Sequence, residues 1–355
     1  MRVAIDTNGL YTTQAGVARY IRGLLKGLEE LRAPGLEHFE LGWPVENFGY
    51  AQPQRALKTA YRELFWTQFV APQILRRRAD LLHSTVNCLI PPPKGLRHVL
   101  SIMDLAFLRQ PERFRRWQRW SWERLLARVP AVDRIITISR FTADEVMKLL
   151  GVPASKIEVV YLASDFHADT AATIEQKPDE QIPAEFFLFV GSLEPGKNLA
   201  LLREVYELAA AQAVVLPPLV IVGARWEGVG REGTPPQNWQ YLGRQPDRVL
   251  VYLYRRALAL LFPSKYEGFG LPLCEAMTLQ CPVICSPVAS LPEVGGNAAL
   301  FAEMNPEGYL KAMWEVMRND QLRSSFIERG LIQARNFSWQ KCAAETIQVY
   351  RSTCS

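Results

Sequence analysis

The stretch at residues 262–294, FPSKYEGFGLPLCEAMTLQCPVICSPVASLPEV, decides the predicted fold of the chain. It continues an apolar run at 257–262, which predicts a buried parallel strand. The letters EGFGLP at 267–272 predict a glycine-rich turn, and Pro272 suits the first turn of a helix, where its missing N–H costs nothing. A second apolar run at 282–285 predicts another strand. The order is therefore strand, glycine-rich loop, helix and strand.

Two carboxylates, Glu267 and Glu275, bracket this loop. The N–H groups of such a loop, together with the positive end of the helix dipole, form a site for an anion such as phosphate. Carboxylates accept hydrogen bonds from sugar hydroxyls, so a pocket that holds both kinds of group suits a sugar nucleotide. Considered alone, the loop is explained equally well as an ordinary strand-to-helix turn with a surface glutamate.

The paired glutamates, the EGFG loop, the EAM triplet and the following PV, ICS and SLPEV segments closely resemble the donor-site signature of family 4 retaining glycosyltransferases. The resemblance covers nearly the whole chain, strongly in 186–300 and more weakly in 1–164. It implies the GT-B fold, an α/β architecture in which two Rossmann-like parallel-sheet domains face a cleft. The donor-binding positions that it implies are Gly16, Gly191, Ser192, Lys197, Glu267, Gly268, Phe269, Gly270, Leu271 and Glu275.

The resemblance also implies roles for individual residues. Glu275 accepts hydrogen bonds from the ribose hydroxyls, and Glu267 holds the sugar or the nearby phosphate edge. Lys197 lies in GSLEPGKN at 191–198, which follows an apolar strand, and it is placed to neutralise the donor diphosphate. The catalytic positions expected from these roles and from strand-end placement are Glu267, Lys197 and Asp104.

Three positions depart from the family pattern. Met103 stands where relatives commonly have a histidine near the transferred sugar, Gly196 where they often have arginine, and Gln280 where they have glycine. Asp104 follows Met103 at the end of a predicted strand. It either contacts the donor or acceptor there, as ligand-binding residues of α/β sheets do, or caps a turn.

Alternating strands and helices, interrupted by a polar stretch, predict two parallel-sheet domains with binding at their strand ends. The expected division is an acceptor-side domain at 1–164, a linker at 165–185 and a donor domain at 186–337, with a terminal helix in 338–355 that crosses back in the family. The other predicted strands lie at 2–6, 81–84, 99–103, 133–138, 157–161, 186–190 and 219–222.

Composition narrows the class of protein. The 355 residues are 48% hydrophobic and 22% charged, which is globular composition with room for a sizeable core. No apolar run approaches the roughly 18–20 residues of a membrane span, and the N-terminus lacks the apolar region of a signal peptide. Six cysteines without CxxC pairs favour reduced thiols and a cytoplasmic location. The absence of Asp-x-Asp argues against a metal ion at the diphosphate, and no cofactor is expected.

The charge is uneven along the chain. Residues 1–164 hold 24 Lys and Arg against 15 Asp and Glu, whereas 165–355 hold 17 against 21. A basic half suits an anionic membrane surface or an anionic substrate. No sequence motif of a nucleic-acid-binding module is recognised. The segment 111–129 interleaves tryptophan with arginine. It is either a helix with one buried and one basic face or a helix that lies on a membrane surface.

Residues 55–78 also predict a helix. Its apolar and aromatic positions are expected to be mostly core residues: Leu57, Tyr61, Leu64, Phe65 and Phe69.

These features predict a metal-independent retaining glycosyltransferase that uses a nucleoside diphosphate sugar. GDP-mannose follows from a resemblance to bacterial mannosyltransferases of polysaccharide assembly, with a glycan or lipid-linked acceptor. A non-hydrolysing sugar-nucleotide epimerase needs more histidines than the four present, and a phosphorylase needs a larger chain with a pyridoxal lysine. The departures at Met103, Gly196 and Gln280 leave one further alternative, a non-catalytic partner subunit that binds sugar nucleotides.

Overall fold

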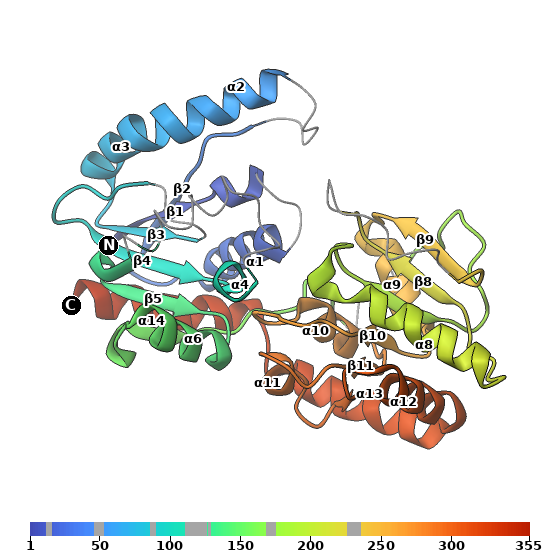
Figure 1. Ribbon diagram of the computed structural model, residues 1–355. Helices are drawn as coiled ribbons and strands as arrows, with labels where there is room; N and C mark the ends of the chain where they lie inside the picture. Colours follow the sequence, from blue (N-terminus) through green and yellow to red (C-terminus); the bar gives the residue numbers. More distant parts are fainter. Residues whose placement is uncertain are drawn as a thin grey trace. The chain divides into compact units, whose positions relative to one another are not determined.

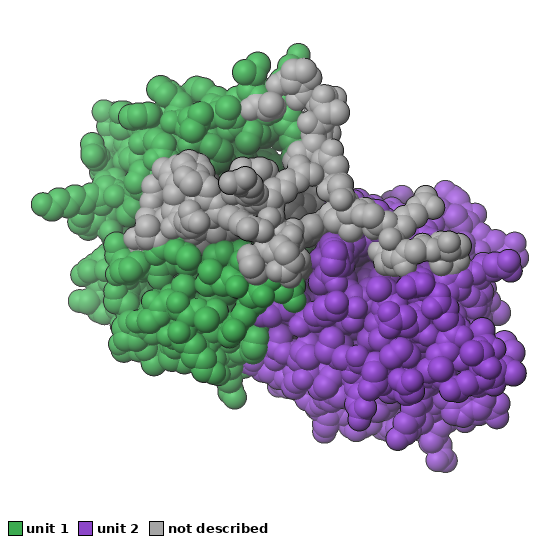
Figure 2. Space-filling view, viewed as in Figure 1, with its two compact units in different colours: residues 1–163, 338–355 green, residues 164–337 purple. Residues whose placement is uncertain are grey.

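The computed structural model describes residues 1–11, 16–45, 53–85, 90–110, 126, 129–167, 175–225 and 236–355. The chain divides into two compact units, one formed by residues 1–163 with 338–355 and the other by 164–337 (Figure 2). In its described part, each unit is built on one six-stranded parallel sheet with helices packed against it (Figure 1). The expected α/β class with two parallel sheets is confirmed.

The first unit has its sheet in the order β2-β1-β3-β4-β5-β6. All neighbouring strands run parallel, and β1 and β3 are almost wholly buried. The strands are β1 (Arg2–Asp6), β2 (Glu37–Leu41), β3 (Leu81–Ser84), β4 (Arg97–Ile102), β5 (Arg134–Thr137) and β6 (Ile157–Val159). The helices are α1 (Gly16–Leu31), α2 (Pro53–Tyr61), a π-helix (Arg62–Val70), α3 (Ala71–Arg78), α4 (Ala106–Arg109), α6 (Arg140–Leu150) and α14 (Trp339–Cys354).

The second unit has the order β12-β11-β10-β7-β8-β9, again parallel throughout. The strands are β7 (Phe187–Val190), β8 (Leu219–Val222), β9 (Trp239–Gly243), β10 (Leu260–Phe262), β11 (Val283–Cys285) and β12 (Ala299–Phe301). The helices are α8 (Leu199–Ala211), α9 (Asp247–Arg256), α10 (Leu271–Thr278), α11 (Leu291–Gly295), α12 (Pro306–Arg318) and α13 (Asp320–Ala334).

The strand order of the second unit reverses at one point. The chain moves outward from β7 to β9, returns to the middle at β10, and moves outward again to β12. Leu188 of β7 therefore pairs with Leu260 of β10, although β8 and β9 lie between them in the sequence. In parallel sheets, ligands bind at the carboxyl ends of the strands where the order reverses. The loops that follow β7 and β10 thus share the position at which a site is expected.

Helix α14 belongs to the first unit and packs along α1. Two glycines on α1 make this approach possible. A Cβ atom on Gly23 would lie 2.1 Å from the indole of Trp339, and one on Gly27 would lie 2.5 Å from the Trp339 carbonyl oxygen. The helices therefore approach more closely than any larger residue at positions 23 and 27 would permit.

Buried hydrogen bonds join α14 and α1 to the sheet. His83 on β3 bonds through Nδ1 to the Tyr350 hydroxyl at 2.6 Å and through Nε2 to Ser101 Oγ at 2.8 Å. The Tyr20 hydroxyl reaches the same Ser101 oxygen at 2.8 Å. Burial lowers the pKa of His83 to about 3, so the imidazole is neutral at physiological pH.

The long helical segment 53–78 corrects one expectation. Its inner face, which includes Trp66, Ala71 and Leu75, packs in a core with residues of β1, β2 and β3. The five apolar residues expected in the core are instead exposed: Leu57 (72%), Tyr61 (42%), Leu64 (67%), Phe65 (48%) and Phe69 (59%). The expectation was wrong because this segment carries apolar residues on two faces, and the sheet covers only one of them. The other Trp- and Arg-rich segment, 111–129, lies almost entirely outside the described residues.

Candidate functional site

Lys197 and Glu267 meet at the carboxyl edge of the second sheet. Lys197 ends the 3₁₀ turn Pro195–Lys197 in the loop after β7, and Glu267 lies in the loop after β10. Their Nζ and Oε1 atoms are 2.5 Å apart, and the two side chains are 19% and 11% exposed. The structure thus brings together the two residues of this unit that were expected to be catalytic.

Neighbouring polar groups hold both loops in place. Ser264 Oγ donates to the same Oε1 atom of Glu267 at 2.7 Å, and Ser290 Oγ donates to the Glu267 carbonyl at 2.9 Å. Across the two loops, the Lys265 N–H donates to the Gly196 carbonyl at 2.9 Å. The Glu267 carboxylate is therefore oriented by contacts on both its side chain and its backbone.

The Lys197–Glu267 pair keeps capacity for a ligand. Glu267 Oε1 accepts from Lys197 and Ser264, whereas Oε2 has no hydrogen-bond partner among the described residues. The ammonium group of Lys197 has three donors, and one hydrogen bond, to Glu267, is present among these residues. Two N–H groups and one carboxylate oxygen thus lie side by side, which suits a ligand that carries both phosphate and hydroxyl groups.

The glycine-rich loop is held tightly where it enters α10. Gly270 is the N-cap, with φ of +96°, and a Cβ atom there would lie 2.8 Å from Leu291 Cδ2. Both the positive φ and the packing require glycine. Phe269 is buried, and its ring packs edge-on against Phe337 at 5.4 Å between centroids. The side chain of Phe269 is thus part of the core, and contacts of Gly268, Phe269 and Leu271 with a donor stay predictions.

Glu275 lies inside α10 and is 3% exposed. The Tyr254 hydroxyl on α9 donates to its Oε2 atom at 3.0 Å. Tyr254 was not expected from the sequence, because no motif marks a buried tyrosine on a neighbouring helix. The hydrogen bond fixes one oxygen of Glu275, and the role of Glu275 toward a ribose stays a prediction.

Gly191 and Ser192 follow β7 directly. The Gly191 N–H donates to the Val222 carbonyl at 3.0 Å. The next loop supplies a second glycine, Gly223, with φ of +149°, and a Cβ atom on it would lie 1.7 Å from the Gly191 carbonyl oxygen. Any larger residue at position 223 would thus displace the backbone of the Gly191 loop.

The remaining expected residues belong to the first unit. Gly16 is the first residue of α1 and is partly exposed, and the residues just before it lie outside the described part of the chain. Asp104 Oδ1 accepts from the Ala106 N–H at 2.9 Å, so Asp104 caps the start of α4. The cap was one of its two expected roles, and a contact with donor or acceptor stays a prediction.

Asp6 is an additional polar group at the carboxyl end of β1. It is 4% exposed, and its Oδ1 accepts from the backbone N–H of Asn8 at 2.9 Å and from the Asn8 amide at 2.8 Å. Burial raises the pKa of Asp6 to about 7, because the surroundings disfavour the charged carboxylate more than these hydrogen bonds favour it. Asp6 is therefore partly protonated near neutral pH.

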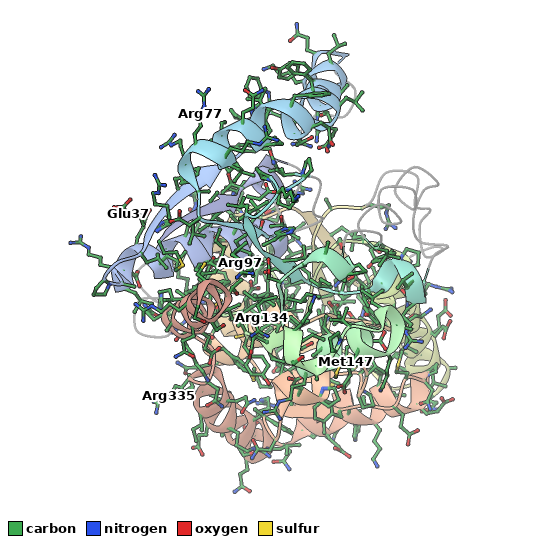
Figure 3. The ribbon with its side chains drawn as sticks, turned by 90° about the vertical axis from the view of Figure 1, so that its left-hand side faces the viewer. Glu37, Arg77, Arg97, Arg134, Met147 and Arg335 are labelled. Atoms are coloured by element: carbon green, nitrogen blue, oxygen red, sulfur yellow. The ribbon has the colours of Figure 1, made fainter. Side chains whose placement is uncertain are left out.

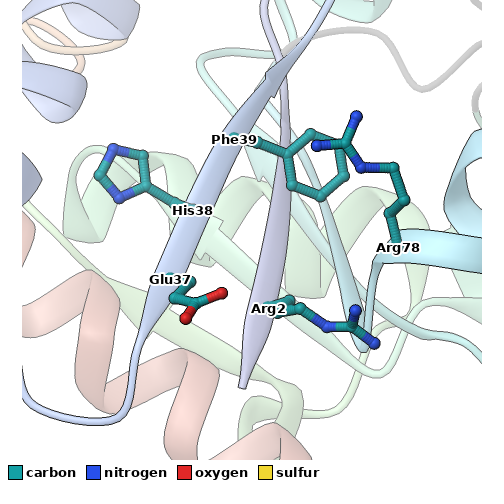
Figure 4. A pocket seen from close by; sticks show the side chains of 5 residues that line it. All are labelled: Arg2, Glu37, His38, Phe39 and Arg78. Carbon is teal, nitrogen blue, oxygen red and sulfur yellow. The ribbon is translucent and has the colours of Figure 1, made fainter.

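A hollow of about 300 Å³ lies at the opposite, amino edge of the first sheet (Figure 4). It is lined by Arg2, Glu37, His38, Phe39 and Arg78. The Arg78 guanidinium stacks over the Phe39 ring at 5.0 Å. Because sheet ligands bind at the carboxyl edge, this hollow is separate from the expected substrate position.

Two features of the described residues bear on partners. These residues contain no group of three or more His, Cys, Asp or Glu side chains arranged to hold a metal ion. They also contain no helix that combines the length and the apolar character needed to cross a bilayer.

Comparisons with known proteins agree with this architecture. Residues 15–166 match the model of Glycosyltransferase Family 4, and residues 171–332 match that of Glycosyl transferases group 1. The O-antigen chain mannosyltransferase B of Escherichia coli is 33% identical, over 99% of this chain and 100% of that protein.

Solved structures show the same fold at low sequence identity. Sucrose-phosphate synthase from Thermosynechococcus elongatus superposes with a TM-score of 0.71 at 16% identity, covering 99% of this chain and 98% of that one. Anabaena HepE, solved in complex with UDP and glucose, has a TM-score of 0.65 at 15% identity, with 99% of each chain covered. With two parallel sheets, two family matches and a full-length relative, this chain belongs to the family 4-like glycosyltransferases of GT-B fold.

Proposed function

We propose that the protein is a retaining mannosyltransferase that moves mannose from GDP-mannose to a glycan or lipid-linked acceptor in polysaccharide assembly. The observation that carries this proposal is the Lys197–Glu267 pair, which lies where the strand order of the second sheet reverses. The Nζ and Oε1 atoms of the pair are 2.5 Å apart. The choice of mannose rests on the Escherichia coli relative, an O-antigen chain mannosyltransferase that is similar along the full length. A nucleoside diphosphate donor is supported by the UDP complex of the structural neighbour HepE.

The proposed chemistry uses no metal ion. As the C1–O bond to the diphosphate breaks, negative charge grows on the leaving group and must be stabilised by donors already in place. Lys197 supplies an ammonium group, and the backbone N–H groups at 268–271 supply the rest. The acceptor hydroxyl attacks C1 from the leaving-group face and passes its proton to a diphosphate oxygen. Because attack and departure occur on the same face, the anomeric configuration is retained.

The two glutamates divide the binding of the donor in this proposal. Glu267 offers Oε2 to a sugar hydroxyl, since its other oxygen is occupied by Lys197 and Ser264. Glu275 accepts from the ribose hydroxyls, and the Tyr254 hydroxyl orients its carboxylate by donating to Oε2. The proposal also assigns the acceptor to the first unit and the enzyme to the cytoplasm, peripheral to the inner face of the membrane. No cofactor takes part.

The alternative of a non-catalytic binding subunit is not favoured. Its basis was the loss of family residues at 103, 196 and 280, yet Lys197, Glu267 and Gly270 are all present and in contact with their supporting groups. At Gln280 the backbone has φ of +62°, the conformation that the glycine of relatives would adopt with less strain. That departure thus costs local backbone strain and removes no polar side chain from the site.

A thermal-shift panel of nucleoside diphosphate sugars tests the donor assignment. A ligand that binds only the folded protein raises its melting temperature. GDP-mannose is expected to give the largest shift in the panel, with or without a chelator, and Lys197→Ala to reduce it. Lys265→Ala is the matched control, because Lys265 is an exposed lysine in the adjoining loop. A panel in which no GDP sugar shifts the melting temperature contradicts the proposal.

A further inference from the structure

Five apolar side chains form one exposed stripe along the helical segment 53–78: Leu57, Tyr61, Leu64, Phe65 and Phe69. The aromatic rings lie next to one another, with centroids 5.4 Å apart for Tyr61 and Phe65 and 5.5 Å apart for Phe65 and Phe69. The π-helix at Arg62–Val70 has more residues per turn than an α-helix, and residues four apart in it lie on one face. We call this surface the aromatic stripe.

The aromatic stripe is unusual for this protein. Thirteen large apolar side chains are exposed among the described residues, and five of them belong to this one helical segment. Single exposed apolar residues are ordinary, whereas a continuous apolar surface marks a place where something else binds. The opposite face of the segment, through Trp66 and Leu75, is already packed on the sheet. The stripe is therefore the outward face of an anchored helix.

Basic side chains stand at both ends of the stripe. Lys58 is exposed near its start, and Arg76, Arg77 and Arg78 are exposed at its end. Arg77 points away from the body of the unit (Figure 3). The hollow beside this end is lined by two arginines, Arg2 and Arg78, and also by Glu37 (Figure 4).

Acidic groups are scarce on the same segment. Residues 53–78 contain six Lys and Arg and one acidic residue, Glu63. Glu63 is paired with Arg62 at 2.6 Å, and that arginine is buried. The outward surface thus combines apolar rings with an excess of positive charge.

We propose that the aromatic stripe lies in the surface of an anionic lipid bilayer, with its rings among the acyl chains and the flanking basic residues on the headgroup phosphates. Helices that lie in the plane of a membrane combine aromatic and aliphatic residues on one face with Lys and Arg beside them. A second copy of the chain fits this surface less well. Any pairing of two such segments brings positive ends against positive surfaces, because the exposed charges of the segment are all basic.

The aromatic stripe is a different element from the segment 111–129, and its contact with lipid does not depend on the donor or the acceptor. It deepens the proposed peripheral location, on which it rests, by naming the surface that touches the bilayer. The membrane contact and the sugar transfer can therefore fail separately in experiment.

Vesicle co-sedimentation of the full chain tests the proposal. The probes are vesicles of phosphatidylcholine alone and of phosphatidylcholine with phosphatidylglycerol. The apolar variant is Phe65→Ser with Phe69→Ser, and its matched control is Ile332→Ser, which removes a 64% exposed apolar residue from α13 in the other unit. The charge variant is Arg76→Gln with Arg77→Gln, and its control is Lys311→Gln with Arg335→Gln, two exposed basic residues of the second unit.

The wild type is expected to bind vesicles that contain phosphatidylglycerol and to lose binding as salt is added. Each stripe variant should bind at least about tenfold more weakly, because burial of two rings or attraction of two charges is lost, while both controls bind like wild type. The melting-temperature shift with GDP-mannose should be the same in all five proteins. Equal vesicle binding by wild type and the Phe65/Phe69 variant overturns the proposal. So does a dimer in light scattering without lipid that this variant abolishes.

Discussion

The Lys197 ammonium group lies 2.5 Å from Glu267 Oε1, although the two residues are 70 positions apart in the sequence. The contact is a consequence of strand order. β7 and β10 are neighbours where the strand order of the second sheet reverses, so the loops that follow them lie side by side. In the proposed mechanism, Lys197 of the first loop neutralises the leaving group while Glu267 of the second loop holds the sugar.

Removing the lysine should affect catalysis more than stability. Lys197→Ala is expected to lower kcat/KM by roughly 100-fold or more, about 3 kcal/mol, because one donor to the developing charge is lost from a partly buried site. Some stability should be lost as well, because the Glu267 side chain is 11% exposed and loses its charged partner, although Ser264 still donates to it. Steady-state kinetics with Lys265→Ala as the control measure this effect. A Lys197→Ala enzyme with wild-type kcat/KM removes Lys197 from the catalytic site.

The two glutamates should give different kinetic changes. Glu275→Ala is expected to weaken donor binding by about 1.5–3 kcal/mol, the usual cost of losing a hydrogen bond to a charged group. Glu267→Ala should lower turnover more than donor affinity. Tyr254→Phe is a useful companion, because it removes the hydrogen bond to Glu275 Oε2 and keeps the carboxylate. Isothermal titration with GDP and GDP-mannose measures affinity, and unchanged binding by Glu275→Ala rules out its ribose contact.

Gln280 supplies a stability prediction. Its φ of +62° is unfavourable for a residue with a Cβ atom, so Gln280→Gly should stabilise the second unit by roughly 1 kcal/mol. Gln212 ends α8 with φ of −92°, where glycine relieves no strain. Gln212→Gly is therefore expected to be neutral or destabilising. Melting temperatures of both variants decide the matter, and a lower value for Gln280→Gly contradicts the prediction.

Asp6 should make stability depend on pH. The pKa of Asp6 is about 7 in the folded protein against an ordinary value of 3.8, so between these values the folded state binds a proton that the unfolded state does not. The stability of the first unit should therefore fall as pH rises through this window, by at most about 1.4 kcal/mol per pH unit, and level off above it. Asp6→Asn should remove this slope, because an amide oxygen can still accept from Asn8.

The comparison that isolates Asp6 is the melting temperature of wild type against Asp6→Asn across that pH range. His83 has the opposite effect, since its pKa is lowered to about 3 and stability then rises with pH as the unfolded imidazole loses its proton. Both proteins contain His83, so its contribution cancels. Asp144→Asn, a change at an exposed carboxylate, is the control. Parallel curves for wild type and Asp6→Asn contradict the prediction.

The central strands could be predicted from the sequence, as could the edge strand β6, whereas the other three edge strands could not. β1, β3, β7, β8 and β10 are short apolar runs, as expected of strands covered on both faces. The three strands that were not predicted, β2, β9 and β12, all lie at sheet edges. Their sequences, EHFEL, WQYLG and ALF, mix polar with apolar residues or are very short, because an edge strand is only partly covered.

The candidate site shows a similar limit. The positions of Lys197 and Glu267 follow from the motif, but their direct contact depends on which strands are neighbours, and sequence spacing does not reveal that. Ser264 could have been noticed, since it precedes Glu267 by three residues in the same turn and donates to it. Gly223 could not, because its importance arises from the approach of the Gly191 backbone. Likewise, the stripe at 57–69 has core-like composition, and only the packing of the sheet shows which face is covered.

The most direct test of the whole account is turnover of GDP-mannose by the purified protein in the presence of a chelator, followed by NMR at the anomeric proton. The account predicts release of GDP, slowly to water and faster with a lipid-linked acceptor extract, and a product with the anomeric configuration of the donor. Lys197→Ala should lose this activity and Lys265→Ala should keep it. A wild-type protein that binds GDP-mannose and never turns it over with the acceptor extract, or that yields the inverted product, would contradict the account.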